Sequence, residues 1–221
     1  MKKLMVALMV VAIASLAQAA VLATWNFNGS NSTDWQAAAP IAGADLLTGV
    51  ASASLSFGST FTATSSANGL RGNGITWGGI SRVIALTDTS FVQIDLTASS
   101  GYTLTVESID GIFSGSGTGV GGQDRWAANS NGGAYSFVIG AATTANGSRS
   151  FDITDTSGAS VGLRYFNSPT ATGGSYGFYS STTANDGIVV NGTATQAIPE
   201  PATMGLLGLG ALAMVLRRKM K

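Results

Sequence analysis

The stretch FVQIDLTASSGYTLTV, residues 91–106, carries the pattern that decides the fold. In its first half, apolar side chains at Val92, Ile94 and Leu96 alternate with polar ones, and the alternation resumes after the Ser-Ser-Gly of residues 99–101. A period of two is typical of a strand with one buried and one exposed face. A short segment containing Gly between two such runs is typical of a tight turn. The stretch therefore predicts two neighbouring antiparallel strands.

The two runs also predict which side chains are buried. Ile94 in the first run and Leu104 in the second fall on the apolar parity, so we expect both to point into a core. Thr103 falls on the opposite parity, so we expect it to face solvent.

Alternating runs of this kind recur along the chain. They occur in Leu22–Phe27, in Ser54–Thr64, at Tyr135, Phe137 and Ile139, at Val161, Leu163 and Tyr165, at Tyr176 and Phe178, and at Ile188 and Val190. Turn motifs separate them, at Asp110-Gly111, Asn146-Gly147, Ser157-Gly158, Asn185-Asp186-Gly187 and Asn191-Gly192. No stretch of the body shows a helical apolar stripe. We therefore expect an all-β fold, an antiparallel β-sandwich of jelly-roll type with about eight to ten strands.

Three longer segments lack this alternation and are expected to be irregular loops. They are Asn28–Gly43, Ala67–Gly79 and Ser114–Gly133. The last contains the Gly-rich run of residues 115–122, which lacks the Gly-Lys-Ser/Thr ending of a phosphate-binding loop.

The N-terminal residues 1–19 have the three regions of a secretory signal peptide. Lys2 and Lys3 precede an apolar run, Leu4–Leu16, and the small residues Ala17 and Ala19 frame the expected cleavage site. We expect this segment to direct export and to be removed.

The C-terminal residues 198–221, IPEPATMGLLGLGALAMVLRRKMK, also have three parts. Pro199-Glu200-Pro201 holds Glu200 on an extended segment, because proline fixes φ and disfavours a helix before it. The apolar run Met204–Leu216 would span about 20 Å as a helix, which is short for a membrane crossing. The basic residues after it favour the cytoplasmic side. These are Arg217, Arg218, Lys219 and Lys221.

This order of parts resembles the PEP-CTERM sorting signal of bacterial surface proteins. The resemblance implies that Pro199, Glu200 and Pro201 are recognised by exosortase, a membrane-embedded processing enzyme, and that residues 198–221 form a transmembrane helix with a basic tail. It also implies export to the cell surface, in a family that accompanies exopolysaccharide production. The competing interpretation is an ordinary C-terminal anchor preceded by a chance pair of prolines.

The expected body, residues 20–197, has five arginines, no lysine and ten acidic residues, a net charge of −5. It has no basic patch that could neutralise phosphates, which argues against nucleic-acid binding. The chain has no cysteine, so a packed core must hold the exported body together without disulfides.

Catalytic chemistry is sparse in this sequence. The absence of His and Cys excludes serine and cysteine triads, zinc sites and histidine bases. A carboxylate pair of the glycosidase kind remains open, but no spacing singles out two of the acidic residues. Asp152–Asp155 or Asn185-Asp186 could contribute oxygen ligands to calcium, although no calcium-binding motif is present. We therefore expect no catalytic residues, no cofactor and no metal site.

Three tryptophans offer the one binding argument. Trp35, Trp77 and Trp126 fall in the expected loops, where exposed rings could stack on sugars, and Asp124 and Arg125 could bond sugar hydroxyls. The alternative is that the rings plug the ends of the core. Convergence of the three on one exposed face would favour sugar binding, and separate burial would count against it.

Two functions follow as expectations, with a glycoside-active enzyme a distant third. The first is a non-enzymatic protein of the cell surface or extracellular matrix, delivered by the tail and associated with exopolysaccharide or biofilm. The second is a carbohydrate-binding module that uses the loop tryptophans.

Overall fold

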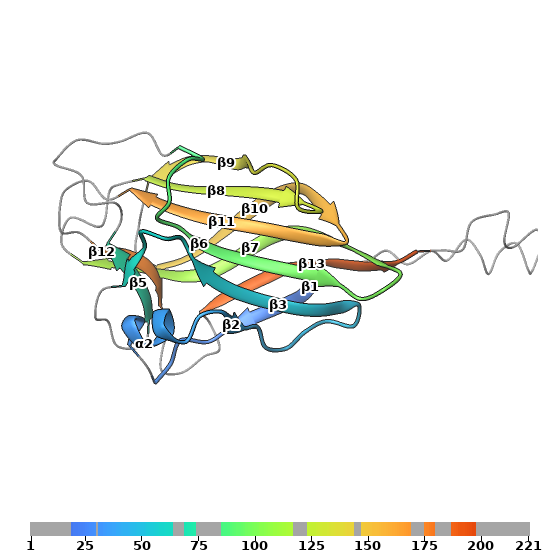
Figure 1. Ribbon diagram of the computed structural model, residues 1–221, viewed down its shortest axis with the longest axis horizontal. Coiled ribbons are helices and arrows are strands. Elements are labelled where there is room, and N and C mark those ends of the chain that lie inside the picture. Colours follow the sequence, from blue (N-terminus) through green and yellow to red (C-terminus); the bar gives the residue numbers. More distant parts are fainter. Residues whose placement is uncertain are drawn as a thin grey trace, which may run out of the picture.

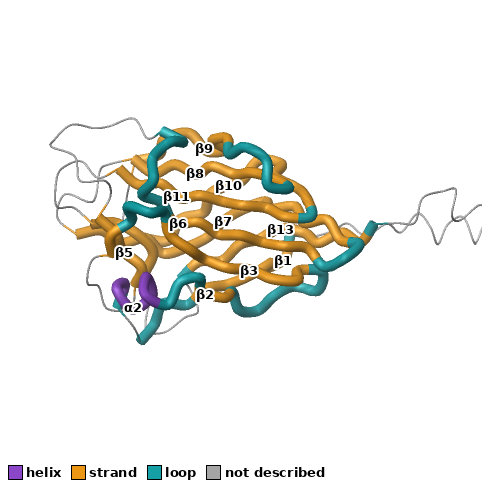
Figure 2. Tube along the Cα trace, in the orientation of Figure 1, coloured by secondary structure: helices purple, strands orange, loops and turns teal. Residues whose placement is uncertain are grey.

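A computed structural model describes residues 19–29, 31–63, 69–73, 85–116, 123–143, 147–168, 175–179 and 187–197. Strands make up most of this part of the chain, and the one short helix, α2 (Ser32–Ala37), lies at one end (Figure 2). The all-β expectation is confirmed.

The strands form two antiparallel sheets, which are the two layers in Figure 1. One has six strands, in the order β2 (Ile41–Ala42), β3 (Val50–Phe57), β6 (Val92–Ala98), β11 (Ser160–Ser168), β8 (Gln123–Ser130) and β9 (Ser136–Thr143). The other follows the order β1 (Ala20–Trp25), β13 (Ile188–Gln196), β7 (Tyr102–Ser116), β12 (Ser175–Tyr179), β5 (Gly69–Asn73) and β4 (Thr62–Ala63), with β10 (Gly147–Gly158) also paired to β7. The jelly-roll connection of these strands stays a prediction.

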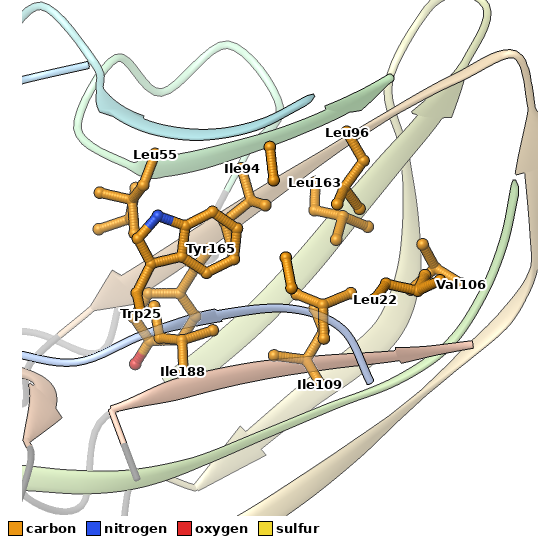
Figure 3. Packing of buried hydrophobic residues seen from close by; sticks show 14 of the residues in the cluster. Leu22, Trp25, Leu55, Ile94, Leu96, Val106, Ile109, Leu163, Tyr165 and Ile188 are labelled. Carbon is orange, nitrogen blue, oxygen red and sulfur yellow. The ribbon is translucent and has the colours of Figure 1, made fainter. Parts of the chain in front are cut away.

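The two sheets curl around one apolar core. Apolar side chains of β1, β7 and β13 meet those of β3, β6 and β11 in the space between the layers (Figure 3). Fully buried members include Leu22, Leu55, Ile94, Leu96, Leu104, Val106, Ile109, Leu163, Ile188 and Val190. The parity predicted for residues 92–96 and 104–106 is therefore confirmed, and Thr103 is exposed as expected.

The prediction that Ile94 and Leu104 lie on neighbouring strands is wrong. Ile94 is in β6, whose partners are β3 and β11, whereas Leu104 is in β7 of the other sheet. The segment 99–101 does turn the chain, but it carries the chain from one sheet to the other instead of closing a hairpin. Two strands of one hairpin and two strands of facing sheets show the same alternation in sequence, because in either arrangement each strand turns only one face to the shared core.

Two predicted turns lie inside strands instead. Asp110-Gly111 is in the middle of β7, and Asn191-Gly192 is in β13, at a shift of register. Asn191 donates its side-chain N–H to Asp110 on the neighbouring strand at 2.6 Å. A Cβ atom at Gly192 would lie 2.0 Å from the Thr105 carbonyl oxygen. The Asn-Gly pair thus marks an irregularity in the strand and a close backbone approach.

The expected loops are only partly irregular. Residues 28–43 include α2 and β2, and residues 114–133 include the end of β7 and all of β8. Residues 74–79 lie outside the described part of the chain. The strands in these segments were not predicted because the segments are rich in glycine and other small residues. They contain few large apolar side chains whose alternation would indicate a strand.

The first and last strands of the body are neighbours. β1 pairs with β13, with Ala20 opposite Gly192 and Trp25 opposite Ile188. The start of β1 and the end of β13 therefore lie at the same end of the sheets (Figure 1). Ala19, directly before β1, is exposed. Within the described residues, no helix is long and apolar enough to cross a membrane. The expected signal peptide up to Gln18 and the expected tail helix lie outside the described residues.

Candidate functional site

Trp126 was expected on a loop, but the structure places it in β8, where it is fully buried. Its ring packs against Tyr165 at 5.1 Å, Phe151 at 6.0 Å and Phe178 at 6.2 Å between ring centroids. The loop expectation for Trp126 is therefore wrong, because the residue lies in a strand and its ring packs among other buried rings. Its face is not available to a ligand outside the molecule.

Asp124 is two residues away on the same face of β8 and is also fully buried. Its carboxylate accepts a hydrogen bond from the Tyr165 hydroxyl at 2.7 Å and forms an ion pair with Arg149 of β10. The Arg149 guanidinium lies over the Phe151 ring, 4.5 Å from its centroid. A buried carboxylate is tolerated only with hydrogen-bonding and charged partners of this kind. Through them Asp124 of β8 is joined to β10 and β11 inside the core. It is therefore not a ligand-binding residue on the surface.

Trp35 lies in α2 and is partly buried. Its ring meets the buried Phe27 ring edge to face, with 5.6 Å between centroids. The neighbouring Ser32 and Gln36 connect α2 to β5 and β4. Ser32 donates to the Gly69 carbonyl at 2.8 Å, and the Gln36 side-chain oxygen accepts the Ala63 N–H at 2.9 Å. Trp35 and Trp126 thus pack in separate places, and Trp77 lies outside the described residues.

Arg125 points the opposite way from Asp124, onto the outer face of the six-stranded sheet. There it joins a group that we call the arginine–aromatic surface, formed by Phe91, Arg125, Tyr135, Phe137 and Arg164 over a floor of Ala127 and Phe166. Most of these residues come from β8, β9 and β11, while Phe91 and Tyr135 lie directly before β6 and β9. The four strands are adjacent in the sheet (Figure 1).

The floor of this surface is apolar and closed. Phe166 is 1% exposed, although it points away from the main core. Its ring contacts Phe91 at 5.6 Å and Phe137 at 6.0 Å, both edge to face. The outer face of the sheet therefore has a small apolar cluster of its own.

Both arginines lie over aromatic rings. The guanidinium carbon of Arg125 is 3.8 Å from the Phe137 centroid, and that of Arg164 is 3.9 Å from the Tyr135 centroid and 4.3 Å from the Phe91 centroid. Arg164 also donates its Nε–H to Gln93 at 2.9 Å. Stacking and hydrogen bonding together hold the guanidinium in place.

Gly162 makes room for this arrangement. A Cβ atom there would lie 2.5 Å from both the Tyr135 hydroxyl and the Asn129 side-chain oxygen. The Asn129 oxygen accepts the Gly162 N–H at 3.0 Å. Tyr135 can therefore reach across β11 only because the residue below it has no side chain.

The electrostatics of the surface act on Tyr135. Burial raises the pKa of its hydroxyl above the ordinary value of 10.0, and the negative charge of Asp95 raises this pKa further. The positive charge of Arg164 and its hydrogen bond act in the opposite direction. The hydroxyl is thus a neutral group at physiological pH.

A shallow depression of about 410 Å³ lies on the outer face of the other sheet. Its lining includes Asp110, Ile112, Ser148, Ser150 and Val189, from β7, β10 and β13. Because it is open and its Asp110 is already bonded to Asn191, it is a weaker candidate than the arginine–aromatic surface.

The parity of the aromatic residues in this segment is a misleading guide to this surface. Tyr135, Phe137 and Ile139 share a parity and were expected on one face, but Ile139 packs against the main core and Phe137 against the outer cluster. The pairing of β8 with β9 shifts register between Trp126 and Ala127, where their partners are Ile139 and Phe137. A bulge of this kind reverses the parity beyond it. The only available signal was the number of aromatic and Arg residues near positions 125–137 and 164–166.

No group of three potential metal-ligating side chains occurs in the described part of the chain. Asp152 is exposed there, and the Asp155 side chain and residues 185–186 are outside it.

Residues 197–219 match the PEP-CTERM protein-sorting motif. The matched segment begins directly after β13 and contains Pro199, Glu200, Pro201, Arg217, Arg218 and Lys219. These residues lie outside the described part of the chain, as does Lys221. A sequence comparison with curated proteins finds no match to the chain.

Proposed function

We propose that this chain is a non-enzymatic protein of the cell surface or extracellular matrix, which is exported and then sorted by exosortase, and which associates with secreted polysaccharide. The observation that carries the proposal is the sorting motif at residues 197–219. This motif supports an exported, exosortase-sorted protein. The matrix role is inferred from the nature of the body that it carries.

The position of the motif supports processing without damage to the fold. The last strand, β13, ends at Gln196, and the last described backbone hydrogen bond runs from the Ala197 N–H to the Gly101 carbonyl at 2.7 Å. Cleavage near Pro199-Glu200-Pro201 would thus remove no residue of either sheet.

The pairing of β1 with β13 supports one fixed orientation of the body relative to the membrane during export. Because Ala20 is opposite Gly192, an N-terminal signal and a C-terminal helix would leave the body from the same end. Both could enter one membrane while the rest of the two sheets points away from it. The body would then be presented to the outside in one direction.

The experiment compares the wild type with a variant in which Pro199, Glu200 and Pro201 are replaced by alanine. We expect both to be exported, because the N-terminal segment is unchanged. The mature wild-type protein should lack Arg217 and Lys219 by mass spectrometry, and the variant should retain them in the membrane fraction. Intact tails on the mature wild type would contradict the proposal.

A carbohydrate-binding role is the second candidate function. Burial of Trp126 removes the residue that was its best support, and the arginine–aromatic surface now favours it instead. Retention on polysaccharide gels distinguishes this role from a purely structural one.

A further inference from the structure

The end of the body at which β13 finishes, on the right in Figure 1, carries no charged residue. We call it the exit end, and it consists of residues 46–53, 96–105, 130–135, 157–161 and 193–197. The paired residues that bring its parts together are Gln196 and Tyr102, Ser157 and Thr105, Ala98 and Val50, Thr97 and Ser160, and Val161 and Ser130. The charged residues that border it, Asp45, Asp95 and Glu107, lie further from the end of β13.

The fold does not explain this lack of charge. Thr97, Ser100 and Ala159 of the exit end are exposed, and exposed positions readily accept Lys or Glu. The opposite end of the sheets does carry charged residues, namely Asp34 in α2, Asp88 before β6, Arg125 near the start of β8 and Arg149 near the start of β10. The two ends of the body therefore differ in a way that suits different surroundings.

The sorting motif follows the exit end without a spacer. Ala197, the first residue of the motif, donates its backbone N–H to the Gly101 carbonyl at 2.7 Å, so the motif and the folded body share this residue. Glu200 is three residues further along, and even a fully extended chain would place it at most about 11 Å from Ala197. This distance is about the diameter of one helix. An enzyme that encloses Pro199-Glu200-Pro201 must therefore touch the exit end.

We infer that the exit end is a docking surface for exosortase, against which the body rests while the tail is processed. The inference rests on the sorting proposed above and adds to it a contact outside the motif. A surface of neutral side chains can be covered by another protein without the cost of burying an unpaired charge. A charge of either sign at this end would add that cost.

A lipid surface fits the exit end less well. Attachment to a membrane surface uses Lys and Arg against anionic lipids, or a large apolar face that enters the headgroup layer. The exit end has no cation, and Leu46 is its one exposed large apolar residue, at 39%. Its chemistry thus favours contact with the enzyme over contact with the bilayer.

Two serines in matched positions provide the test. Ser100 is the second residue of a turn at the exit end, closed by a backbone hydrogen bond of 2.9 Å. Ser59 is the second residue of a turn closed by one of 3.0 Å, and this turn follows β3, at the opposite end. Both serines are exposed. The same charge can therefore be placed at either end in the same local structure.

The experiment is a pulse-chase of the full chain in the cells that produce it, with removal of the tail followed by mass. Ser100→Glu and Ser100→Lys should each lengthen the half-time of tail removal about tenfold, as expected for an unpaired charge in a contact. Ser100→Gln, which is neutral, should change the half-time less than about twofold. Ser59→Glu and Ser59→Lys should also stay within about twofold of the wild type, because they lie well beyond the screening length from the contact.

A spacer separates the contact from other effects of the charge. Eight Gly and Ser residues inserted between Ala197 and Ile198 add about 16 Å of average reach, so that exosortase can bind the tripeptide without touching the body. The spacer alone should slow tail removal, because docking no longer contributes. With the spacer present, Ser100→Glu should be processed as fast as the parent. Melting temperatures and removal of residues 1–19 verify that each variant is folded and exported.

Four results would overturn the inference: no effect of the charges at Ser100, an equal effect at Ser59, slow removal that persists with the spacer, or faster removal with the spacer alone. Slowing by Ser100→Glu together with acceleration by Ser100→Lys would identify an anionic lipid surface as the occupant instead of exosortase. A wild type that keeps its tail would contradict the sorting itself. A processed wild type that is insensitive to the Ser100 charges would contradict only the docking surface.

Discussion

At the scale of single residues, the indole of Trp126 is both tightly packed and incompletely bonded. Three aromatic rings surround it, and its N–H has no hydrogen-bond partner among the described residues. Trp126→Ala should therefore lower the free energy of unfolding by about 3–5 kcal/mol, the range for emptying a large core site. Trp126→Phe should cost much less, because it retains a ring and removes the unpaired donor.

Urea unfolding of the three proteins measures this difference. Trp126→Ala with wild-type stability would mean that the ring is not in the core. Trp126→Phe as damaging as Trp126→Ala would mean that the indole N–H has a partner.

Tyr135 predicts a dependence of stability on alkaline pH. The folded protein holds the proton of this hydroxyl to a higher pH than the unfolded chain does, because its pKa is raised. The corresponding stability is complete below about pH 10, the unfolded value, and is lost as pH rises through the folded pKa. Tyr135→Phe cannot lose this proton, so its stability should fall less steeply above pH 10 in urea titrations. Parallel curves for the two proteins would show that the hydroxyl is not held in this environment.

The residues of the candidate surface could be predicted only in part. The sequence analysis selected Arg125 as a possible ligand-binding residue, but placed it on a loop together with Asp124 and Trp126. In the structure these two neighbours point into the core. Adjacent residues of a strand face opposite ways, so the sequence motif Asp-Arg-Trp is split between two environments once it is a strand. For Arg164 the sequence shows only the neighbouring aromatic residues 165 and 166, because the rings over which its guanidinium lies come from other segments of the chain.

At the scale of elements, Ile94, Leu104 and Thr103 provide a direct test of the two strands that follow one another in β6 and β7. Ile94 and Leu104 are both fully buried, from opposite sheets, so Ile94→Ala and Leu104→Ala should each cost about 2–5 kcal/mol. Thr103→Ala, at an exposed position of β7, should cost less than about 1 kcal/mol. Equal losses in chemical unfolding would show that the register of β7 is different.

The strands could be predicted where large apolar residues alternate, as in residues 92–96, and not where small residues dominate, as in residues 123–130. Sheet membership could not be predicted at all, because alternation reports a buried face and not the strand beside it. Asn191-Gly192 shows a further limit. The pair favours a turn, but inside β13 its Asn bonds across to Asp110 and its Gly admits the Thr105 carbonyl.

At the scale of the whole molecule, the sheets are completed by the two ends of the body. β13 lies between β1 and β7, so the last described strand joins the first strand to the longest one. Composition and periodicity were enough to predict one all-β body, since no cysteine and few charged residues leave a packed core as its only support. The adjacency of its ends could not be predicted, because it depends on pairings across almost the whole chain.

This adjacency leads to a prediction about truncation. A chain that ends at Ala197 lacks the sorting motif but keeps every residue of both sheets, so its body should melt within about 2 °C of the full chain in the same detergent. A chain that ends at Gly187 lacks β13, which leaves β1 without its strand partner and exposes one side of β7. It also leaves the core without the fully buried Ile188 and Val190, so this chain should not fold cooperatively. Circular dichroism melts of the three chains measure both effects. A large loss of stability in the chain that ends at Ala197 would show that the tail belongs to the fold, and then its removal by exosortase could not release an intact body.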